Sequence, residues 1–313
     1  MDPIILFFVL GLILGISKAE VRLPSQIYDF ITIVLLLSIG LKGGIELSKQ
    51  PFSSIFFKIA IVMLIGFIMP LIAYPVLKYV GKFKREDAAS IAAHYGSVSV
   101  GTFAVCIAYL TSREIFYEEY MAIFVVILEI PAIIIGIVLA KGISKETNWQ
   151  KVGHEVFLGK GVALLVGGML IGLLSSPSGI ETVAPLFFDL FKGILALFLL
   201  EMGLITSSQI GSLKKYGIFL VGFGVLMPII SGTIGVIVGN MLGFSIGGAT
   251  VVGTLIASAS YIAVPAAMRI SVPEANPTLS LSASLGITFP FNIVAGIPLY
   301  FYMANYTKSF LGA

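Results

Sequence analysis

The stretch HYGSVSVGTFAV at residues 94–105 decides the fold. It lies inside a long apolar segment of the kind that spans a membrane, yet Gly96, Ser97, Ser99, Gly101 and Thr102 are small or polar residues that weaken a helix. Irregular backbone is tolerated at membrane depth only where it is buried in protein or lines a wet cavity. The stretch therefore predicts a helix that is interrupted for a purpose, with backbone N–H and C=O groups freed for an ion.

The composition of the 313-residue chain is that of a polytopic membrane protein. Hydrophobic residues make up 58% of it and charged residues 11%, and the mean hydropathy is +1.06, a balance that soluble domains do not show. Cys106 is the single cysteine, so no disulfide can form within the chain. Because the sequence has no zinc-type ligand cluster, P-loop, dinucleotide fingerprint or nucleophile elbow, we expect neither an enzyme, nor a cofactor, nor a nucleic-acid partner.

Hydropathy and charge breaks predict an all-α protein with ten membrane spans. The predicted spans are 3–16, 27–47, 55–79, 87–111, 118–142, 159–175, 183–207, 216–242, 245–270 and 277–307. The first of them is interpreted as a short span and not as a signal peptide, because no basic residues precede it and no clear cleavage site follows it.

The basic residues lie mostly on one side of the predicted membrane. Of the 19 Lys and Arg residues, thirteen fall in loops on one side and four on the other, with Lys58 and Lys192 left out of both sums. The positive-inside rule then predicts both termini outside the plasma (inner) membrane and the 143–158 linker in the cytoplasm.

Three short motifs recur in the same order in the two halves of the chain. GLILG at 11–15 matches GMLIG at 168–172, IGLKGG at 39–44 matches MGLITS at 202–207, and GFIMP at 66–70 matches GVLMP at 224–228. Five spans in each half require the second copy to insert upside down relative to the first. We therefore predict a first inverted repeat at 1–142 and a second at 159–313, the plan of secondary transporters.

The repeat predicts a second interruption in the ninth span, and ASASYIAVP at 257–265 provides one. Both breaks come near the bilayer midplane at 1.5 Å of rise per residue. Helix N-termini suit an anion, and serine or threonine hydroxyls can cap the ends or donate to an oxyanion. The alternative is that these small residues only let helices pack closely. The expected anion-binding residues are Gly96, Ser97, Val98, Ser99, Gly101 and Thr102 of the first break, and Ser258, Ala259, Ser260, Tyr261 and Ala263 of the second.

Glu129, in the middle of the fifth predicted span, is the candidate ligand of a coupling cation. Pro131, two residues later, frees a carbonyl nearby, and the alternative for Glu129 is a structural partner of a freed N–H. Asn292 lies in the corresponding region of the tenth span and can supply a neutral oxygen. Together with Ser99 and Ser260 these residues form the expected sodium site, with Glu129 as the one charged ligand.

Four further polar residues inside the predicted spans have less specific interpretations. His94 adjoins the first break and is either a proton relay or a hydrogen-bonded structural residue. Glu201 fits a hinge or a subunit contact equally well. Asp189 and Lys192 are three residues apart, so we expect them to form an ion pair.

Five motifs along the chain can be compared with those of known families: IGLKGG (39–44), AAHYGSVSVGTFA (92–104), LEIPA (128–132), LLEMGL (199–204) and VPEANP (272–277). Together they resemble the sodium-dependent bicarbonate transporter family, the SbtA-like proteins. The resemblance implies a core domain of spans 3–5 and 8–10 and a gate domain of spans 1–2 and 6–7. It also implies homotrimers and elevator-type, sodium-coupled bicarbonate uptake, with the anion between the two broken helices. Well-known members bind a small PII-like cytoplasmic regulator, and the shorter linker of this chain departs from them.

Alternatives to bicarbonate symport remain at this point. A related inverted-repeat plan also serves sodium/proton antiporters, which would want a pair of carboxylates beside the breaks. A sodium-coupled carrier of another anion is a further alternative, and a larger organic anion would need a wider cavity and an arginine within reach. A non-transporting membrane sensor is disfavoured because the linker is too short to hold a signalling domain.

Overall fold

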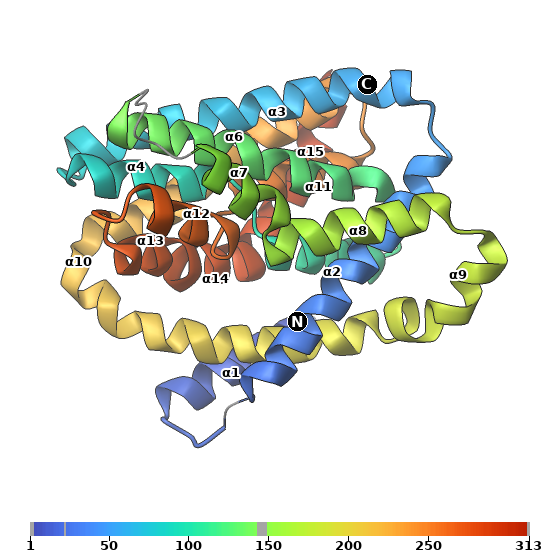
Figure 1. The fold of residues 1–313 in the computed structure, drawn as a ribbon, viewed down its shortest axis with the longest axis horizontal. Coiled ribbons are helices and arrows are strands. Elements are labelled where there is room, and N and C mark those ends of the chain that lie inside the picture. The colour runs from blue at the N-terminus through green and yellow to red at the C-terminus, as the bar shows by residue number, and fades with distance from the viewer. Residues whose placement is uncertain (1–2, 22, 143–148, 312–313) are drawn as a thin grey trace.

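The computed structural model describes residues 3–21, 23–142 and 149–311, and this part of the chain folds into helices joined by short turns (Figure 1). Seven helical segments in it are long and apolar enough to cross a membrane. Three shorter apolar helices, Pro3–Ile16, Lys160–Leu174 and Ile246–Ala257, lie within the first, sixth and ninth predicted spans, the last of them covering only the first half of its span. The prediction of an all-helical, multi-pass membrane protein is therefore confirmed.

The described residues of the first half of the chain form six α-helices. They are α1 (Pro3–Ile16), α2 (Ser25–Ser48), α3 (Phe52–Pro75), α4 (Arg85–Gly96), α5 (Val100–Thr111) and α6 (Ala122–Lys141). A π-helical turn, η1 (Val76–Val80), extends α3, and a 3-10 turn, η2 (Glu119–Met121), leads into α6.

The second half is divided into more pieces. Its helices are α7 (Trp149–Leu158), α8 (Lys160–Leu174), α9 (Pro177–Ala184), α10 (Phe191–Met241), α11 (Ile246–Ala257), α12 (Ala263–Ser271), α13 (Pro277–Ala283), α14 (Phe289–Phe291) and α15 (Ile297–Leu311). The π-helical turns η3 (Pro185–Asp189), η4 (Ser284–Thr288) and η5 (Asn292–Gly296) join some of them. Helix α7 fills the described part of the predicted 143–158 linker and packs on α12 and α8.

Both predicted interruptions are present. Helix α4 ends at Gly96 and α5 begins at Val100, while α11 ends at Ala257 and α12 begins at Ala263. Pro265 lies in the first turn of α12, where its missing N–H is not needed.

Helix α10 covers two predicted spans that are joined at Gly217. The backbone of Gly217 has φ +79° and ψ 172°, values outside the helical region that a glycine adopts at little cost. In Figure 1, α10 runs across the lower part of the molecule, above α1, and then turns back at the left. One glycine thus reverses the chain between the seventh and eighth predicted spans.

Two pairs of helices pack backbone to backbone through the recurring glycine motifs. A Cβ on Gly11 of α1 would lie 2.0 Å from the Leu200 carbonyl oxygen of α10. A Cβ on Gly40 of α2 would lie 2.4 Å from the Leu165 carbonyl oxygen of α8. GLILG therefore meets MGLITS, and GMLIG meets IGLKGG, as expected of small residues at helix contacts in a membrane.

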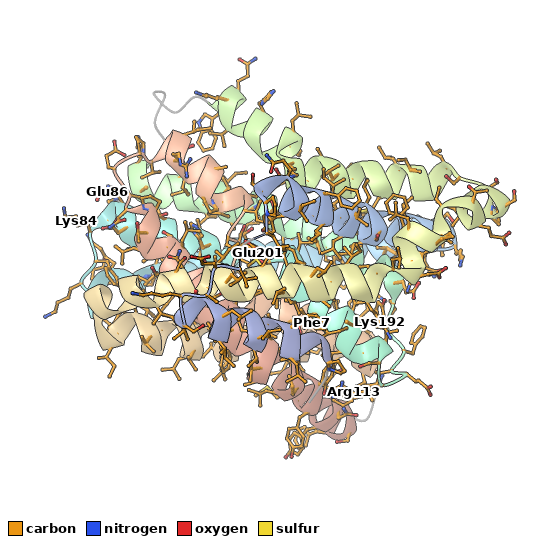
Figure 2. All side chains as sticks on the ribbon, turned by 90° about the horizontal axis from the view of Figure 1, so that it is seen from below. Phe7, Lys84, Glu86, Arg113, Lys192 and Glu201 are labelled. Carbon is orange, nitrogen blue, oxygen red and sulfur yellow. The ribbon has the colours of Figure 1, made fainter. Side chains whose placement is uncertain are left out.

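The broken helices lie among the remaining elements. Helix α4 packs on α3 and α6, and α11 packs on α10 and α15. Figure 2 shows Lys84 and Glu86 at one end of the molecule and Arg113 and Lys192 toward the other, with Glu201 between them. The breaks are buried between these ends, because the residues from Ser97 to Ser99 and from Ser258 to Ser260 are at most 3% exposed.

Candidate functional site

Hydroxyl groups of the first break cap the start of α5. Ser99 is the N-cap of α5, and its Oγ accepts the Thr102 backbone N–H at 3.1 Å and the Thr102 hydroxyl at 2.9 Å. An N-cap bond of this kind satisfies one of the donors that a helix start leaves free. The predicted capping role of Ser99 is thus present in the structure.

The two breaks are hydrogen-bonded to each other. The Ser99 N–H donates to Ser258 Oγ at 2.9 Å, and Ser258 Oγ donates in turn to the Leu255 carbonyl at 2.8 Å. A backbone bond of 2.9 Å runs from the Ser260 N–H to the His94 carbonyl. Residues about 160 positions apart in the sequence therefore form one buried junction.

Ser97, between α4 and α5, differs from the other serines of the junction. Its side chain is 1% exposed, yet its Oγ has no hydrogen-bond partner among the described residues. A buried polar group without a partner is costly, and native structures retain few of them. Within the described residues the Ser97 hydroxyl thus makes no internal hydrogen bond, whereas the Ser99 hydroxyl accepts two from Thr102.

Tyr261 and Gly101 bring the second break against the first. A Cβ on Gly101 would lie 2.4 Å from Tyr261 Oη and 2.8 Å from the Phe198 ring of α10. The Tyr261 hydroxyl lies near Ser99 but forms no well-aligned hydrogen bond within the described residues. Only glycine leaves room for this close approach.

Glu129 of α6 faces the starts of both second half-helices. It lines a cavity of about 30 Å³ together with Val100 and Gly101 of α5 and with Ile262 and Ala263 at the start of α12. The Glu129 side chain is 5% exposed, and its Oε2 has no hydrogen-bond partner in the described part of the chain. Its carboxylate is the one buried charged group there, and within 3–21, 23–142 and 149–311 no three His, Cys, Asp or Glu residues cluster as metal ligands.

Asn292 lies at the second break and has partners for both of its polar atoms. Its Nδ2 donates to the Ala257 carbonyl at 3.0 Å, which is the last carbonyl of α11. Its Oδ1 accepts the Tyr300 hydroxyl at 2.8 Å. The structure thus gives Asn292 a capping contact, with one oxygen lone pair left over.

The remaining predicted anion-site residues are grouped around the same junction. Gly96, Val98, Thr102, Ala259 and Ser260 are buried, and Ala263 is half-buried at the start of α12. A Cβ on Gly96 would lie 2.2 Å from the Pro70 ring, so this glycine is required by packing against α3. The structure brings the two sets of predicted residues together.

The other polar residues take distinct positions. His94 Nδ1 bonds the Ser90 carbonyl at 2.7 Å, while its buried Nε2 has no partner among the described residues. Glu201 Oε2 accepts the Leu23 N–H at 3.4 Å, next to the turn between α1 and α2. The predicted ion pair of Asp189 and Lys192 is wrong, because Asp189 ends the π-helical turn η3 and no ion pair joins the two side chains.

Two residues beside the breaks were not expected from the sequence. Phe198 of α10 closes the small cavity next to Gly101, and nothing distinguishes it from the other phenylalanines of that span. Tyr300 positions Asn292 and also donates to the Pro228 carbonyl at 3.1 Å. A buried tyrosine hydroxyl in an apolar span is a signal that could have identified Tyr300.

The family model described as the Na+-dependent bicarbonate transporter superfamily matches residues 3–305, nearly the whole chain. No curated protein matches the chain significantly.

Proposed function

The chain belongs to the Na+-dependent bicarbonate transporter superfamily, and on that premise we propose that it carries bicarbonate into the cell together with sodium. A transporter family implies a non-enzymatic function. The observation that carries the proposal is the buried junction of two interrupted helices, with the Ser97 hydroxyl of the first break unpartnered among the described residues.

The proposed anion site uses donors from both breaks. Ser97 Oγ and the Tyr261 hydroxyl are buried or half-buried donors without partners in the described part of the chain, and the N-terminal ends of α5 and α12 add partial positive charge. Ser99 and Ser258 keep the two breaks in register and leave Ser97 for the ligand. A small, flat oxyanion with several acceptor atoms suits such a set of donors.

The proposed sodium site is at Glu129, with Ser260 and Asn292 as neutral oxygen ligands, because both lone pairs of the Ser99 hydroxyl already accept hydrogen bonds from Thr102. A buried carboxylate oxygen without a partner is the natural anchor of a cation. Glu129 lies beside the same helix starts as the anion site, so each ion reduces the electrostatic cost of binding the other. A sodium/proton antiporter would want a second buried carboxylate, and none accompanies Glu129 in the described residues.

We also propose that the ten spans form two inverted repeats of five, with helices 4 and 9 broken. The paired contacts of α1 with α10 and of α2 with α8 support it, because GLILG of the first half meets MGLITS of the second and IGLKGG of the first half meets GMLIG of the second. In this arrangement α1, α2, α8 and the first part of α10 form the gate, and the remaining spans form a core that moves as an elevator. Homotrimers and a PII-like regulator are further expectations from the family, and outside termini in the inner membrane are the expectation from the positive-inside rule.

Coupling to sodium has an energetic reason. A monovalent anion that enters against a negative-inside potential costs about 2.3 kcal/mol per 100 mV. One accompanying sodium ion cancels that charge, so the sodium concentration gradient alone drives uptake. A tenfold sodium gradient then supports about tenfold accumulation, since about 1.4 kcal/mol corresponds to a factor of ten.

Labelled bicarbonate uptake into proteoliposomes tests the proposal. The pH is fixed and the potential clamped, and uptake is compared with and without an inward sodium gradient. Accumulation that requires the sodium gradient supports the proposal. Liposomes that hold folded protein but accumulate no bicarbonate contradict it, and a screen of other small anions then identifies the cargo.

A further inference from the structure

A second cavity lies away from the break junction, along the far part of α5. Its volume is about 330 Å³, and none of its lining residues belongs to the proposed ion sites. Its walls come from α2, α5, the segment 117–122, η3 and the start of α10. This volume is within the range of small-molecule sites.

One wall of this pocket is aromatic. The phenylalanines that line the pocket are Phe103 of α5, Phe187 and Phe188 of η3 and Phe191 of α10, together with Ile107. An inorganic anion would gain nothing from such a wall, whereas a flat apolar group would bury its surface there. The pocket is therefore shaped for the apolar body of a ligand.

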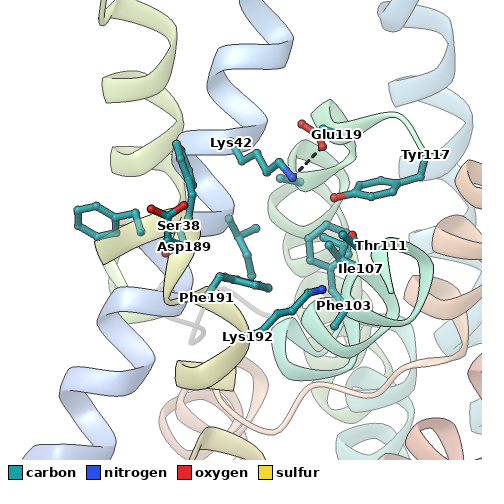
Figure 3. Close-up of a pocket in the computed structure, with 15 residues that line it drawn as sticks. Ser38, Lys42, Phe103, Ile107, Thr111, Tyr117, Glu119, Asp189, Phe191 and Lys192 are labelled. Carbon is teal, nitrogen blue, oxygen red and sulfur yellow. Dashed lines mark ion pairs between the residues drawn. The ribbon is translucent and has the colours of Figure 1, made fainter. Parts of the chain in front are cut away.

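Tyr117 supplies a hydrogen-bond donor without a partner. Its side chain is 5% exposed, and its hydroxyl has no well-aligned partner within the described residues, although Thr111 is close. In Figure 3 the Tyr117 hydroxyl points into the pocket. Burial raises the pKa of this phenol, so it remains a donor at neutral pH.

Lys192 supplies a positive charge to the pocket. Figure 3 shows its side chain extending toward α5, whereas the Asp189 carboxylate lies on the other side of Phe191. No ion pair involves Lys192 in the described part of the chain. The pocket's other ammonium group, on Lys42, is already neutralised by Glu119 at 2.7 Å (Figure 3).

We propose that this pocket binds a small aromatic monocarboxylate, with the carboxylate held by Lys192 and Tyr117 and the ring among the four phenylalanines. Lys192 belongs to α10 and Tyr117 precedes η2, so a bound ligand connects elements from the two halves of the chain. If the proposed gate and core move against each other, the ligand also inhibits uptake. That consequence rests on the proposed function, but binding itself does not.

Calorimetric titration of the purified full chain with benzoate tests the site, with benzamide as the neutral analogue and acetate as the analogue without a ring. We expect saturable benzoate binding that Lys192→Gln weakens by about tenfold or more and that Tyr117→Phe weakens by about threefold to tenfold. Benzamide binding stays within about twofold in Lys192→Gln, and acetate binds more weakly than benzoate.

The matched control is Lys49→Gln, which removes an ammonium group paired with Glu46 at 2.5 Å outside the pocket. It leaves benzoate binding unchanged, as does Ser97→Ala at the break junction. The proposal is overturned if wild-type protein shows no saturable benzoate binding, if Lys192→Gln has no effect, or if Ser97→Ala abolishes binding. Equal affinity for acetate and benzoate would also overturn it, because the aromatic wall would then have no role.

Discussion

Two serines of the break junction, Ser258 and Ser97, are expected to respond to alanine substitution in opposite ways. Ser258 Oγ accepts the Ser99 N–H at 2.9 Å, and Ser99 is 3% exposed. In Ser258→Ala this buried N–H loses its acceptor, which costs about 1–3 kcal/mol of stability. Ser97 Oγ has no partner in the described residues, so Ser97→Ala removes no internal hydrogen bond and leaves the ligand-free protein at least as stable.

Ser97→Ala, which leaves stability unchanged or higher, is expected to weaken bicarbonate binding. A hydrogen bond to a charged group contributes about 1.5–3 kcal/mol, so Ser97→Ala raises the bicarbonate concentration for half-maximal uptake by about tenfold to a hundredfold. Thermal unfolding of the purified variants in detergent, combined with uptake into proteoliposomes, measures both quantities.

Two results would refute this reasoning. If Ser97→Ala leaves the bicarbonate dependence of uptake unchanged, Ser97 is not in the anion site. If Ser258→Ala unfolds at the wild-type temperature, the bond between the two breaks contributes nothing to stability.

Three further substitutions test other parts of the account. Glu129→Gln raises the sodium concentration for half-maximal uptake more than it changes the bicarbonate dependence, whereas equal loss of both with misassembled protein on gel filtration would indicate a structural role. Gly40→Ala places a Cβ 2.4 Å from the Leu165 carbonyl oxygen and lowers stability by about 1–3 kcal/mol in thermal unfolding. Its control is Gly167→Ala, which meets nothing within 4 Å and is neutral or stabilising; equal loss in both variants would contradict the packing argument. Lys42→Gln breaks the pair with Glu119, whose side chains are 44% and 30% exposed, so it changes the uptake rate less than about fivefold. In the double variant Lys42→Gln/Glu119→Gln the uptake rate is the same as in Lys42→Gln alone. Additive effects of the two substitutions on the uptake rate would argue against the pair.

The positions of the two breaks were predictable because their causes are local. Runs of glycine and serine weaken a helix wherever they occur, and Pro265 marks the first turn of α12. The capping role of Ser99 follows from the same local rule. The spans were predictable because hydropathy depends on composition and length alone.

The contacts that join the breaks were not predictable from one sequence. Nothing near Ser99 specifies Ser258 as its partner, since the two are 159 residues apart. The Tyr300 contact to Asn292 depends on the π-helical turn η5 that lies between α14 and α15. The prediction of an ion pair between Asp189 and Lys192 was wrong because Asp189 lies in the π-helical turn η3. Three-residue spacing brings side chains together only within a continuous α-helix.

The central claim, that sodium and bicarbonate move together through this protein, is tested most directly by the reciprocal flux. Proteoliposomes with equal sodium on both sides, strong buffer and clamped potential receive an inward bicarbonate gradient, and labelled sodium is followed. We expect the bicarbonate gradient to drive transient sodium accumulation, and an equal gradient of an inert anion to drive none. Sodium movement that responds only to a pH gradient, or that ignores bicarbonate, would contradict the account.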